Sequence, residues 1–299
     1  MIPSQLDRID SFIAPFRVES GEGFSLKNID SASTAGLTAA DRGVAREMLE
    51  GGYEWLGEQQ EILFAQDHWA VLLVVQAMDA AGKDGTIKHV TSGMNPKGCE
   101  VASFKQPSAE ELDHDYLWRY IPHVPARGQI GIFNRSYYEE VLVVKVHQQL
   151  LATQKLPPSL VTPNIWNERY EDIANFERYL TRNGVRVLKF FLHVSKEEQK
   201  RRLIDRYDNP EKNWKFTAAD VAERRHWDEY QAAYEEAIRR TSAPHAPWYV
   251  VPADNKWFTR MVVAAAVVKE IAGLNLRYPV IDAPTRVALD AARARLDAE

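Results

Sequence analysis

The sequence contains little cysteine and no long apolar run. Cys99 is the single cysteine among 299 residues, which excludes a disulfide framework or a thiolate zinc site within one chain. No segment approaches the ~20 consecutive apolar residues that a membrane-spanning helix needs. The first residues also lack the basic start and apolar core of a signal peptide. We therefore expect a cytoplasmic protein with no membrane partner.

Positive charge is not in excess either, because 37 Lys and Arg residues face 42 Asp and Glu residues and the formal net charge is −5. General nucleic-acid binders are usually basic, so we expect no nucleic-acid partner. An anionic ligand would need a local cluster of cations instead. The hydrophobic fraction of 45% is enough for one large α/β domain or for one domain with appendages.

One stretch predicts a phosphate-binding loop. Residues 71–75 are a run of Val and Leu typical of a buried strand, and the letters MDAAGKDG follow at residues 78–85. The backbone N–H groups of such a loop, the N-terminus of the next helix and the Lys83 ammonium all attract phosphate. The other interpretation is an ordinary strand-to-helix turn with a surface lysine.

The loop departs from the usual pattern G-x-x-x-x-G-K-[ST] at two positions. Ala77 stands at the first glycine position, which an alanine tolerates unless φ is positive there. Asp84 stands at the position of the hydroxyl that binds Mg²⁺. The metal would then need another ligand, and Asp79 inside the loop is the candidate.

Five predicted strands alternate with predicted helices, which favours a five-stranded parallel sheet covered by helices on both faces. Such a sheet binds its ligand beyond the C-terminal ends of its strands. The predicted strands are residues 71–75, 100–104, 129–133, 185–194 and 248–251. The main predicted helices are residues 38–66, 85–92, 108–119, 136–151, 164–182 and 258–271.

A second candidate site follows the predicted strand at residues 129–133. In phosphate-loop kinases a strand-end Asp often holds Mg²⁺, but Asn134 occupies that position here. Arg135 comes next, and a guanidinium beside a phosphate loop favours a bidentate phosphate clamp over a surface ion pair. Glu139 could restore the missing charge at a metal site, or it could only complete a helix capping box with Ser136.

Residues 196–227 form a predicted basic hairpin. Its cations lie on two helices that flank a break at residues 207–210, and Arg202 and Arg206 share a helix face. One interpretation is a lid that closes over an anionic ligand and keeps out water. The other is a solvated surface that nearby acids partly neutralise. The cations of the hairpin include Lys200, Arg201, Arg202, Arg206, Lys212, Lys215, Arg224 and Arg225.

Four stretches together resemble the family-2 polyphosphate kinases, a group of phosphate-loop kinases with a thymidylate-kinase-like core. They are MDAAGKDG at 78–85, FNRSYYE at 133–139, DNPEKNWKF at 208–216 and HAPWY at 245–249. The resemblance implies Mg²⁺-dependent phosphoryl transfer between inorganic polyphosphate and nucleotides. Asn134 followed by Glu139 resembles the subgroup that accepts both nucleoside mono- and diphosphates.

The resemblance also implies roles for individual residues, with Mg²⁺ held by Asp79 and Glu139. The catalytic candidates are Asp79, Lys83, Asn134, Arg135 and Glu139. The candidate polyphosphate-binding residues are Ala80, Ala81, Gly82, Lys83, Asp84, Gly85, Arg201, Arg202, Arg206, Lys212 and Lys215. The candidate nucleotide-binding residues are Lys105, Arg119, Arg127 and Arg135.

The expected organisation is an N-terminal arm at residues 1–36, a kinase domain at 37–275 with a lid at about 200–227, and a tail at 276–299. The expected partners are polyphosphate and adenine nucleotides, with guanine nucleotides as a further option. We also expect a homo-oligomer, either a dimer or a tetramer. Two alternatives stay open: an ATP-dependent nucleoside monophosphate kinase, and a polyanion-binding protein without catalysis.

Overall fold

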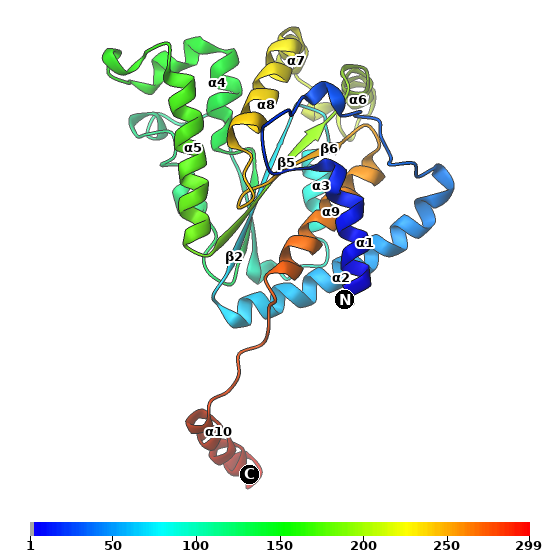
Figure 1. Cartoon of the computed structure of the whole chain (residues 1–299), viewed down its shortest axis with the longest axis vertical. Coiled ribbons are helices and arrows are strands. Elements are labelled where there is room, and N and C mark those ends of the chain that lie inside the picture. Colours follow the sequence, from blue (N-terminus) through cyan, green and yellow to red (C-terminus); the bar gives the residue numbers. More distant parts are fainter. Residues whose placement is uncertain (1–2) are drawn as a thin grey trace.

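The computed structural model describes residues 3–299 and contains a six-stranded mixed sheet (Figure 1). The strand order across the sheet is β1-β6-β5-β2-β4-β3, which puts β5 and β2 at its centre. The strands are β1 (Arg17–Val18), β2 (Ala70–Ala77), β3 (Cys99–Ser103), β4 (Ile130–Asn134), β5 (Val185–His193) and β6 (Trp248–Pro252).

The sixth strand, β1, corrects the expectation of a five-stranded parallel sheet. β6, β5, β2, β4 and β3 pair in parallel, whereas β1 pairs antiparallel with β6. β1 comes from the segment predicted as a surface arm, of which residues 1 and 2 lie outside the described residues. Two residues are too few to show the alternation of apolar and polar residues that marks a strand, so β1 could not be predicted from the sequence.

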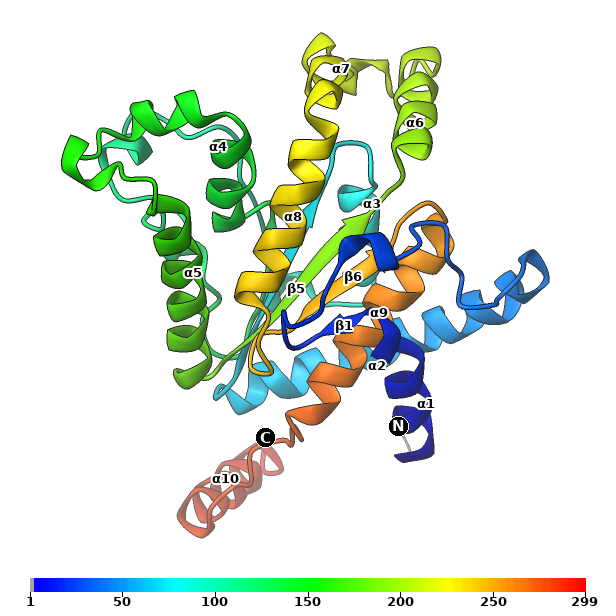
Figure 2. The ribbon, with the colours of Figure 1, turned by 45° about the horizontal axis from the view of Figure 1, so that its top comes forward.

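Helices cover both faces of the sheet (Figures 1 and 2). On one face α5 packs against β5 and α8, and on the other α9 packs against β6, α1, α2 and α3. The helices are α1 (Pro3–Ile13), α2 (Arg42–Gln66), α3 (Lys83–Val90), α4 (Val143–Val146), α5 (Ile165–Arg182), α6 (Lys196–Asp208), α7 (Ala218–Glu223), α8 (Trp227–Thr241), α9 (Lys256–Gly273) and α10 (Ala283–Leu296).

Two predicted helices are largely absent. The capping contacts between Ser108 and Glu111 form, but only a 3-10 turn at Glu111–Asp113 follows them. The segment 136–151 contains the four-residue α4 between a 3-10 helix at Tyr137–Val141 and the start of another at Gln148–Gln154. Within this segment, the adjacent residues Tyr137 and Tyr138 are both fully buried. Successive residues of a helix point about 100° apart, so burial of two adjacent large rings works against a regular surface helix.

A charged network lies inside the core. Lys189 of β5 is 0% exposed and Glu177 of α5 is 1% exposed, and their charged atoms are 2.6 Å apart. The Lys189 ammonium also donates to the Tyr138 hydroxyl at 3.1 Å and the Thr241 carbonyl at 2.7 Å. Tyr137 and Tyr138 both donate to Glu177. Burial lowers the pKa of Lys189 and raises that of Glu177, and each partner's charge opposes the shift.

The two ends of the chain differ in packing. Ile13, Phe16 and Leu26 near the N-terminus are buried in the main core. By contrast, α10 extends away from the sheet and is exposed along its whole length (Figure 1). Within residues 3–299, no helix is both long enough and apolar enough to cross a membrane.

Candidate active site

A cavity of about 1000 Å³ lies at the C-terminal edge of β2 and β4, between α3, α6 and α9. Cations outnumber carboxylates in its wall, which therefore suits an anion. The ten cations are Lys83, Lys88, Lys105, Arg135, Arg202, Arg206, Lys212, Lys215, Lys256 and Arg260. The four carboxylates are Asp79, Asp84, Asp205 and Asp220.

The phosphate loop follows β2 directly and leads into α3, which begins at Lys83. Ala80 and Gly82 have φ values of +62° and +110°, so the loop turns through the left-handed region twice. Ala77 is the last residue of β2 and is not among the described residues with positive φ, which explains why alanine fits where the usual pattern has glycine. Residues 80–85 all line the cavity.

Lys83 has unused hydrogen-bonding capacity. Its ammonium donates to the carbonyl of Ala77 at 2.8 Å, and it has no other protein partner among the described residues. An ammonium has three N–H donors, so two remain for a ligand. Burial lowers the pKa of Lys83, and the charge of Asp79 only partly offsets this effect.

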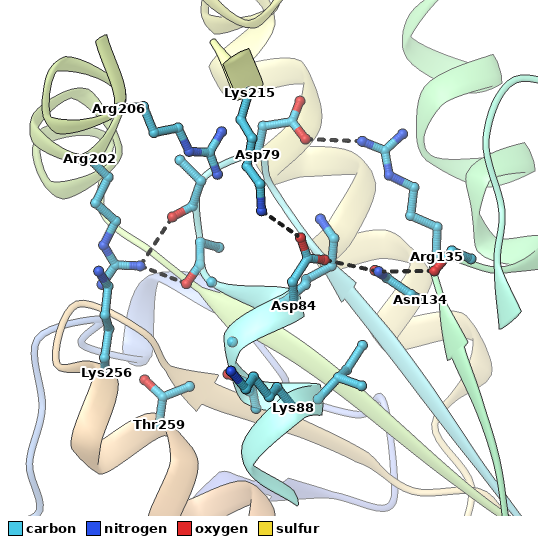
Figure 3. A pocket seen from close by; sticks show the side chains of 18 of the residues that line it. Asp79, Asp84, Lys88, Asn134, Arg135, Arg202, Arg206, Lys215, Lys256 and Thr259 are labelled. Carbon is cyan, nitrogen blue, oxygen red and sulfur yellow. Dashed lines mark hydrogen bonds and ion pairs between the residues drawn. The ribbon is translucent and has the colours of Figure 1, made fainter. Parts of the chain in front are cut away.

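The side chains of Arg135 and Asp79 both line the cavity and point toward each other (Figure 3). The Arg135 guanidinium donates to the Asp79 carboxylate at 3.0 Å, and both side chains keep partial exposure, 40% and 34%. Burial acts to lower the pKa of Arg135, but Glu139 and Asp79 outweigh it and raise that pKa. Arg135 has a φ of +66°, a strained conformation for a residue with a side chain, as is common at functional sites.

Glu139 does not form the predicted capping box. Its side chain accepts a hydrogen bond from the Gln76 amide at 3.0 Å. The Ser136 hydroxyl accepts from the Tyr138 N–H instead, and no contact between the Glu139 carboxylate and the Ser136 N–H occurs in the described residues. The carboxylate is therefore held toward the end of β2, where the phosphate loop begins.

Asn134 joins the ends of two parallel strands to α3. Its amide donates to Asp84 at 3.0 Å and to the Ser103 hydroxyl at 3.4 Å. Lys215 approaches the other oxygen of Asp84 at 3.9 Å, and Figure 3 shows this chain of contacts. Asp84, which stands where the usual pattern has a hydroxyl, thus connects the phosphate loop to the basic hairpin.

The basic hairpin closes one side of the cavity. Arg206, Lys212 and Lys215 line it, as does Arg202. Arg201 does not line the cavity. Its side chain lies on the outer surface of α6, where it is 58% exposed and pairs with Glu198 and Asp205. The hairpin thus supplies three cations with exposed charge to the cavity, along with one that is buried.

The family model for "Polyphosphate kinase 2 (PPK2)" matches residues 41–278. The chain belongs to this family. The match includes the phosphate loop, the Asn134–Glu139 turn, the basic hairpin and α9. The resemblance inferred from the four sequence stretches is thereby confirmed.

Similar proteins agree with this assignment. The chain is 46% identical over 264 residues to the AMP/ADP-polyphosphate phosphotransferase of Meiothermus ruber, covering 88% of this chain and 94% of that protein. It is 51% identical over 234 residues to the ADP-polyphosphate phosphotransferase of Rhodopseudomonas palustris, covering 78% and 81%. The crystal structure of polyphosphate kinase 2 from Arthrobacter aurescens matches with a TM-score of 0.83 and 40% identity, covering 93% and 95%.

The predicted nucleotide-binding cations do not gather in one place. Lys105 lines the cavity together with Arg135. Arg119 pairs with Glu111 and donates to the Lys105 carbonyl, outside the cavity wall. Arg127 donates to the His68 carbonyl. His68 comes just before β2, so this contact lies at the N-terminal ends of the strands, whereas the phosphate loop lies at their C-terminal ends.

Sequence reasoning missed several cavity residues. Lys256, Thr259 and Arg260 lie at the start of α9, which was predicted only as an apolar helix, and Lys88 lies on α3. Lys256 and Arg260 are four residues apart and therefore share a helix face. That spacing, directly after a strand end, was the available signal. Burial lowers the pKa of Lys256, with the charge of Arg202 acting in the same direction.

Proposed function

We propose that this family member transfers a phosphoryl group between inorganic polyphosphate and nucleotides, converting AMP to ADP and ADP to ATP. The observation that carries the proposal is the cavity that the phosphate loop and the basic hairpin enclose, in which ten cations face four carboxylates. A linear polyanion suits such a wall. The names of the two relatives, an AMP/ADP-polyphosphate phosphotransferase and an ADP-polyphosphate phosphotransferase, support the same reaction.

The donor would lie on residues 80–85 and against Arg206, Lys212 and Lys215. Its terminal P–O bond breaks and the shortened polyphosphate keeps the electron pair, while a terminal phosphate oxygen of the nucleotide forms the new bond. Lys83 and Arg135 stabilise the charge on the transferred group. Such a reaction depends on in-line positioning and charge stabilisation, so no nucleophilic side chain is required.

The chain's donor set fits Mg²⁺. This ion prefers one or two carboxylates together with substrate phosphates and water, rather than a cage built from protein alone. Asp79 and Glu139 would supply the carboxylates, and the Gln76 amide, which donates to Glu139 at 3.0 Å, would orient the second of them. Bound there, Mg²⁺ would neutralise phosphate charge.

Lys105 and Arg135 are the cations that we propose for the nucleotide phosphates. Both line the cavity, and Arg135 lies beside the loop that would hold the donor. We include guanine nucleotides as further acceptors, since no base-specific contact is assigned.

The test is chromatography of AMP, ADP, GMP and GDP after incubation with Mg²⁺ and either polyphosphate or ATP as the only donor. We expect new di- and triphosphates with polyphosphate and little product from AMP with ATP alone. Product from AMP with ATP but not with polyphosphate would indicate a nucleoside monophosphate kinase. Polyphosphate binding without any product would indicate a non-catalytic polyanion binder.

The metal ligands are tested by Asp79→Asn and Glu139→Gln. Each change removes one carboxylate charge while keeping the side-chain shape, so kcat should fall and the Mg²⁺ concentration at half-maximal rate should rise. Asp205→Asn is the matched control, because it removes a carboxylate from the cavity wall outside the loop and the Asn134–Glu139 turn. Wild-type Mg²⁺ dependence in both variants would contradict the assignment.

Other expectations stay predictions. They are a homo-oligomer, either dimer or tetramer, a cytoplasmic location, the absence of a nucleic-acid partner, and the division at residues 36 and 275 with a lid at about 200–227. Light scattering coupled to size-exclusion chromatography measures the oligomeric state directly.

A further inference from the structure

Helix α6 holds the peptide groups of the phosphate loop through two side chains. The Gln199 amide donates to the Asp79 carbonyl at 3.0 Å. The Arg202 guanidinium donates to the next two carbonyls, those of Ala80 at 3.2 Å and Ala81 at 2.6 Å (Figure 3). Three consecutive loop carbonyls therefore accept hydrogen bonds from one helix.

All five N–H donors of Arg202 bind acceptors within the protein. Besides the two loop carbonyls, it donates to the carbonyls of Ala253 at 2.6 Å and Asp254 at 3.0 Å. Its Nε donates to Glu198 at 2.6 Å. A guanidinium has five N–H donors, and these are five contacts. The side chain is 4% exposed, so Arg202 has no donor left for a ligand, although it borders the cavity.

These contacts determine where the loop N–H groups point. In a trans peptide the C=O and the following N–H point in opposite directions. Carbonyls held toward α6 therefore direct the next N–H groups away from α6. Ala81 donates within the loop to the Met78 carbonyl. The N–H groups of Ala80 and Gly82 have no acceptor in the described part of the chain, so they are available to an anion.

The same contacts hold a strained residue. Ala80 has a φ of +62°, a conformation that costs a residue with a side chain on the order of 1–3 kcal/mol. Its carbonyl is one of the two that Arg202 binds. Arg202 also holds the carbonyl of Ala81, and without that contact the next peptide would be free to turn over and remove the Gly82 N–H from the cavity.

Gln199 extends this connection into the second half of the basic hairpin. Its side-chain oxygen accepts from Arg224 at 2.5 Å, and Arg224 also donates to the Lys196 carbonyl at 3.1 Å. Arg224 comes directly after α7. A continuous set of hydrogen bonds thus runs from the far side of the hairpin to the Asp79 carbonyl.

We propose that Arg202 and Gln199 are positioning residues that orient the phosphate loop, and that Arg202 does not itself bind polyphosphate. This inference rests on the proposed function of the cavity. It replaces the sequence-based assignment of Arg202 to the polyphosphate-binding cations, while Arg206, one helical turn away, keeps that assignment.

The test compares Arg202→Gln, Arg202→Lys and Arg206→Gln by steady-state kinetics and by calorimetric binding of tripolyphosphate at several salt concentrations. Each direct cation–phosphate contact contributes about 0.7–0.9 to the slope of log affinity against log salt. Arg206→Gln should lower that slope by about one contact and raise the KM for polyphosphate more than it changes kcat. Arg202→Gln should leave the slope unchanged and lower kcat by about 10- to 100-fold, as the loss of outer-shell support does elsewhere.

Arg202→Lys separates charge from geometry. Lysine keeps the charge but has three donors in place of five, so it should stay impaired if orientation matters and recover if charge matters. Gln199→Ala covers the case in which Arg202→Gln fails to fold, because it removes one loop contact and the Arg224 contact while leaving the buried Arg202–Glu198 ion pair intact. We expect it to lower kcat by about fivefold with an unchanged salt slope, a smaller loss than outer-shell removal typically causes.

Lys200→Gln is the matched control, since it removes a cation from the exposed side of α6 and should behave as the wild type. A lower salt slope in Arg202→Gln, or recovery in Arg202→Lys, would overturn the inference, as would wild-type kcat in Gln199→Ala. Wild-type enzyme without polyphosphate turnover would instead contradict the proposed function, and the binding slopes would still decide the role of Arg202.

Discussion

Lys83 in the cavity and Lys189 in the core both have a lowered pKa, but they differ in how many hydrogen bonds their ammonium groups donate to the protein. Burial lowers the pKa of both ammonium groups. Lys189 uses three donors, to Glu177, Tyr138 and the Thr241 carbonyl. Lys83 uses one donor, to the Ala77 carbonyl, and no carboxylate lies within ion-pair distance of it in the described residues.

The difference distinguishes a structural charge from a charge prepared for a ligand. A buried charge is costly unless it is paired and hydrogen-bonded. Lys189 meets that requirement within the protein, so its network is complete without a substrate. Lys83 meets it only in part, and a phosphate oxygen would supply the missing acceptors. A completed network predicts an effect on stability, whereas an incomplete one predicts an effect on binding and catalysis.

The largest effect should come from Lys189→Met. This change leaves the Glu177 carboxylate buried without its cation, which typically costs about 3–5 kcal/mol of unfolding free energy. Urea unfolding measures the loss. Burial already raises the pKa of Glu177, so without Lys189 the folded protein should take up a proton there. Because the folded state then binds more protons than the unfolded state, the variant should lose further stability as pH rises.

The double variant Lys189→Met/Glu177→Gln checks the reason for that loss. Gln keeps an oxygen that can accept from Tyr137 and Tyr138 but carries no charge. We expect the double variant to recover most of the unfolding free energy. A double variant as unstable as Lys189→Met alone would mean that packing, not the unpaired charge, explains the loss.

Lys83→Met should show the opposite pattern. Removing one preorganised group that stabilises transferred charge commonly lowers kcat by about 10²–10³-fold. Stability should change little or rise slightly, because the variant removes a partly buried ammonium with one hydrogen bond. Kinetics with polyphosphate and AMP, together with urea unfolding, measure both quantities. Loss of several kcal/mol of stability with near-normal kcat would make Lys83 a structural residue like Lys189.

The pH dependence of Lys83 sharpens the comparison further. Its folded-state pKa lies below the usual lysine value of 10.5, so kcat/KM should fall as pH rises through that lowered pKa. Between the two pKa values the unfolded state binds more protons, so the contribution of Lys83 to stability rises with pH. The pH profile of kcat/KM and the difference in unfolding free energy between wild type and Lys83→Met test these opposite trends. Parallel trends would contradict the pKa direction.

Much of the site was predictable because its chemistry is contiguous in the sequence. The phosphate loop, the Asn134–Glu139 turn and the basic hairpin each place their polar residues within a few positions, next to a recognisable strand or helix break. The cavity of the structure brings most of these residues together. The six-stranded sheet was not predictable, because the pairing of the two-residue β1 depends on a partner more than 200 residues away.

The rest was not predictable, because the sequence shows charge but not burial. Arg202 and Arg206 share a helix face, yet Arg202 is 4% exposed and Arg206 is only partly buried. The different roles that we propose for them follow from the carbonyls that the phosphate loop and the residues after β6 bring to α6. Lys256 and Arg260 belong to the site because parallel pairing places the end of β6 beside that of β5, which no local pattern reveals.

The smallest effect should come from Tyr137→Phe. The Tyr137 hydroxyl donates to Glu177 Oε1 at 3.0 Å, and the Tyr138 hydroxyl donates to the same oxygen at 2.8 Å. Because that oxygen keeps one donor, the loss should be about 1 kcal/mol of unfolding free energy. Tyr179→Phe, at a side chain that is 63% exposed, is the control and should leave the unfolding free energy unchanged.

Tyr137 lies two residues from Arg135, so the kcat of Tyr137→Phe decides whether the core network around Glu177 is separate from the cavity contacts of Arg135. A kcat within about twofold of wild type, less than 0.5 kcal/mol in the barrier, keeps the core network structural. A loss of about tenfold or more, at unchanged unfolding free energy, would show that the core network also positions Arg135.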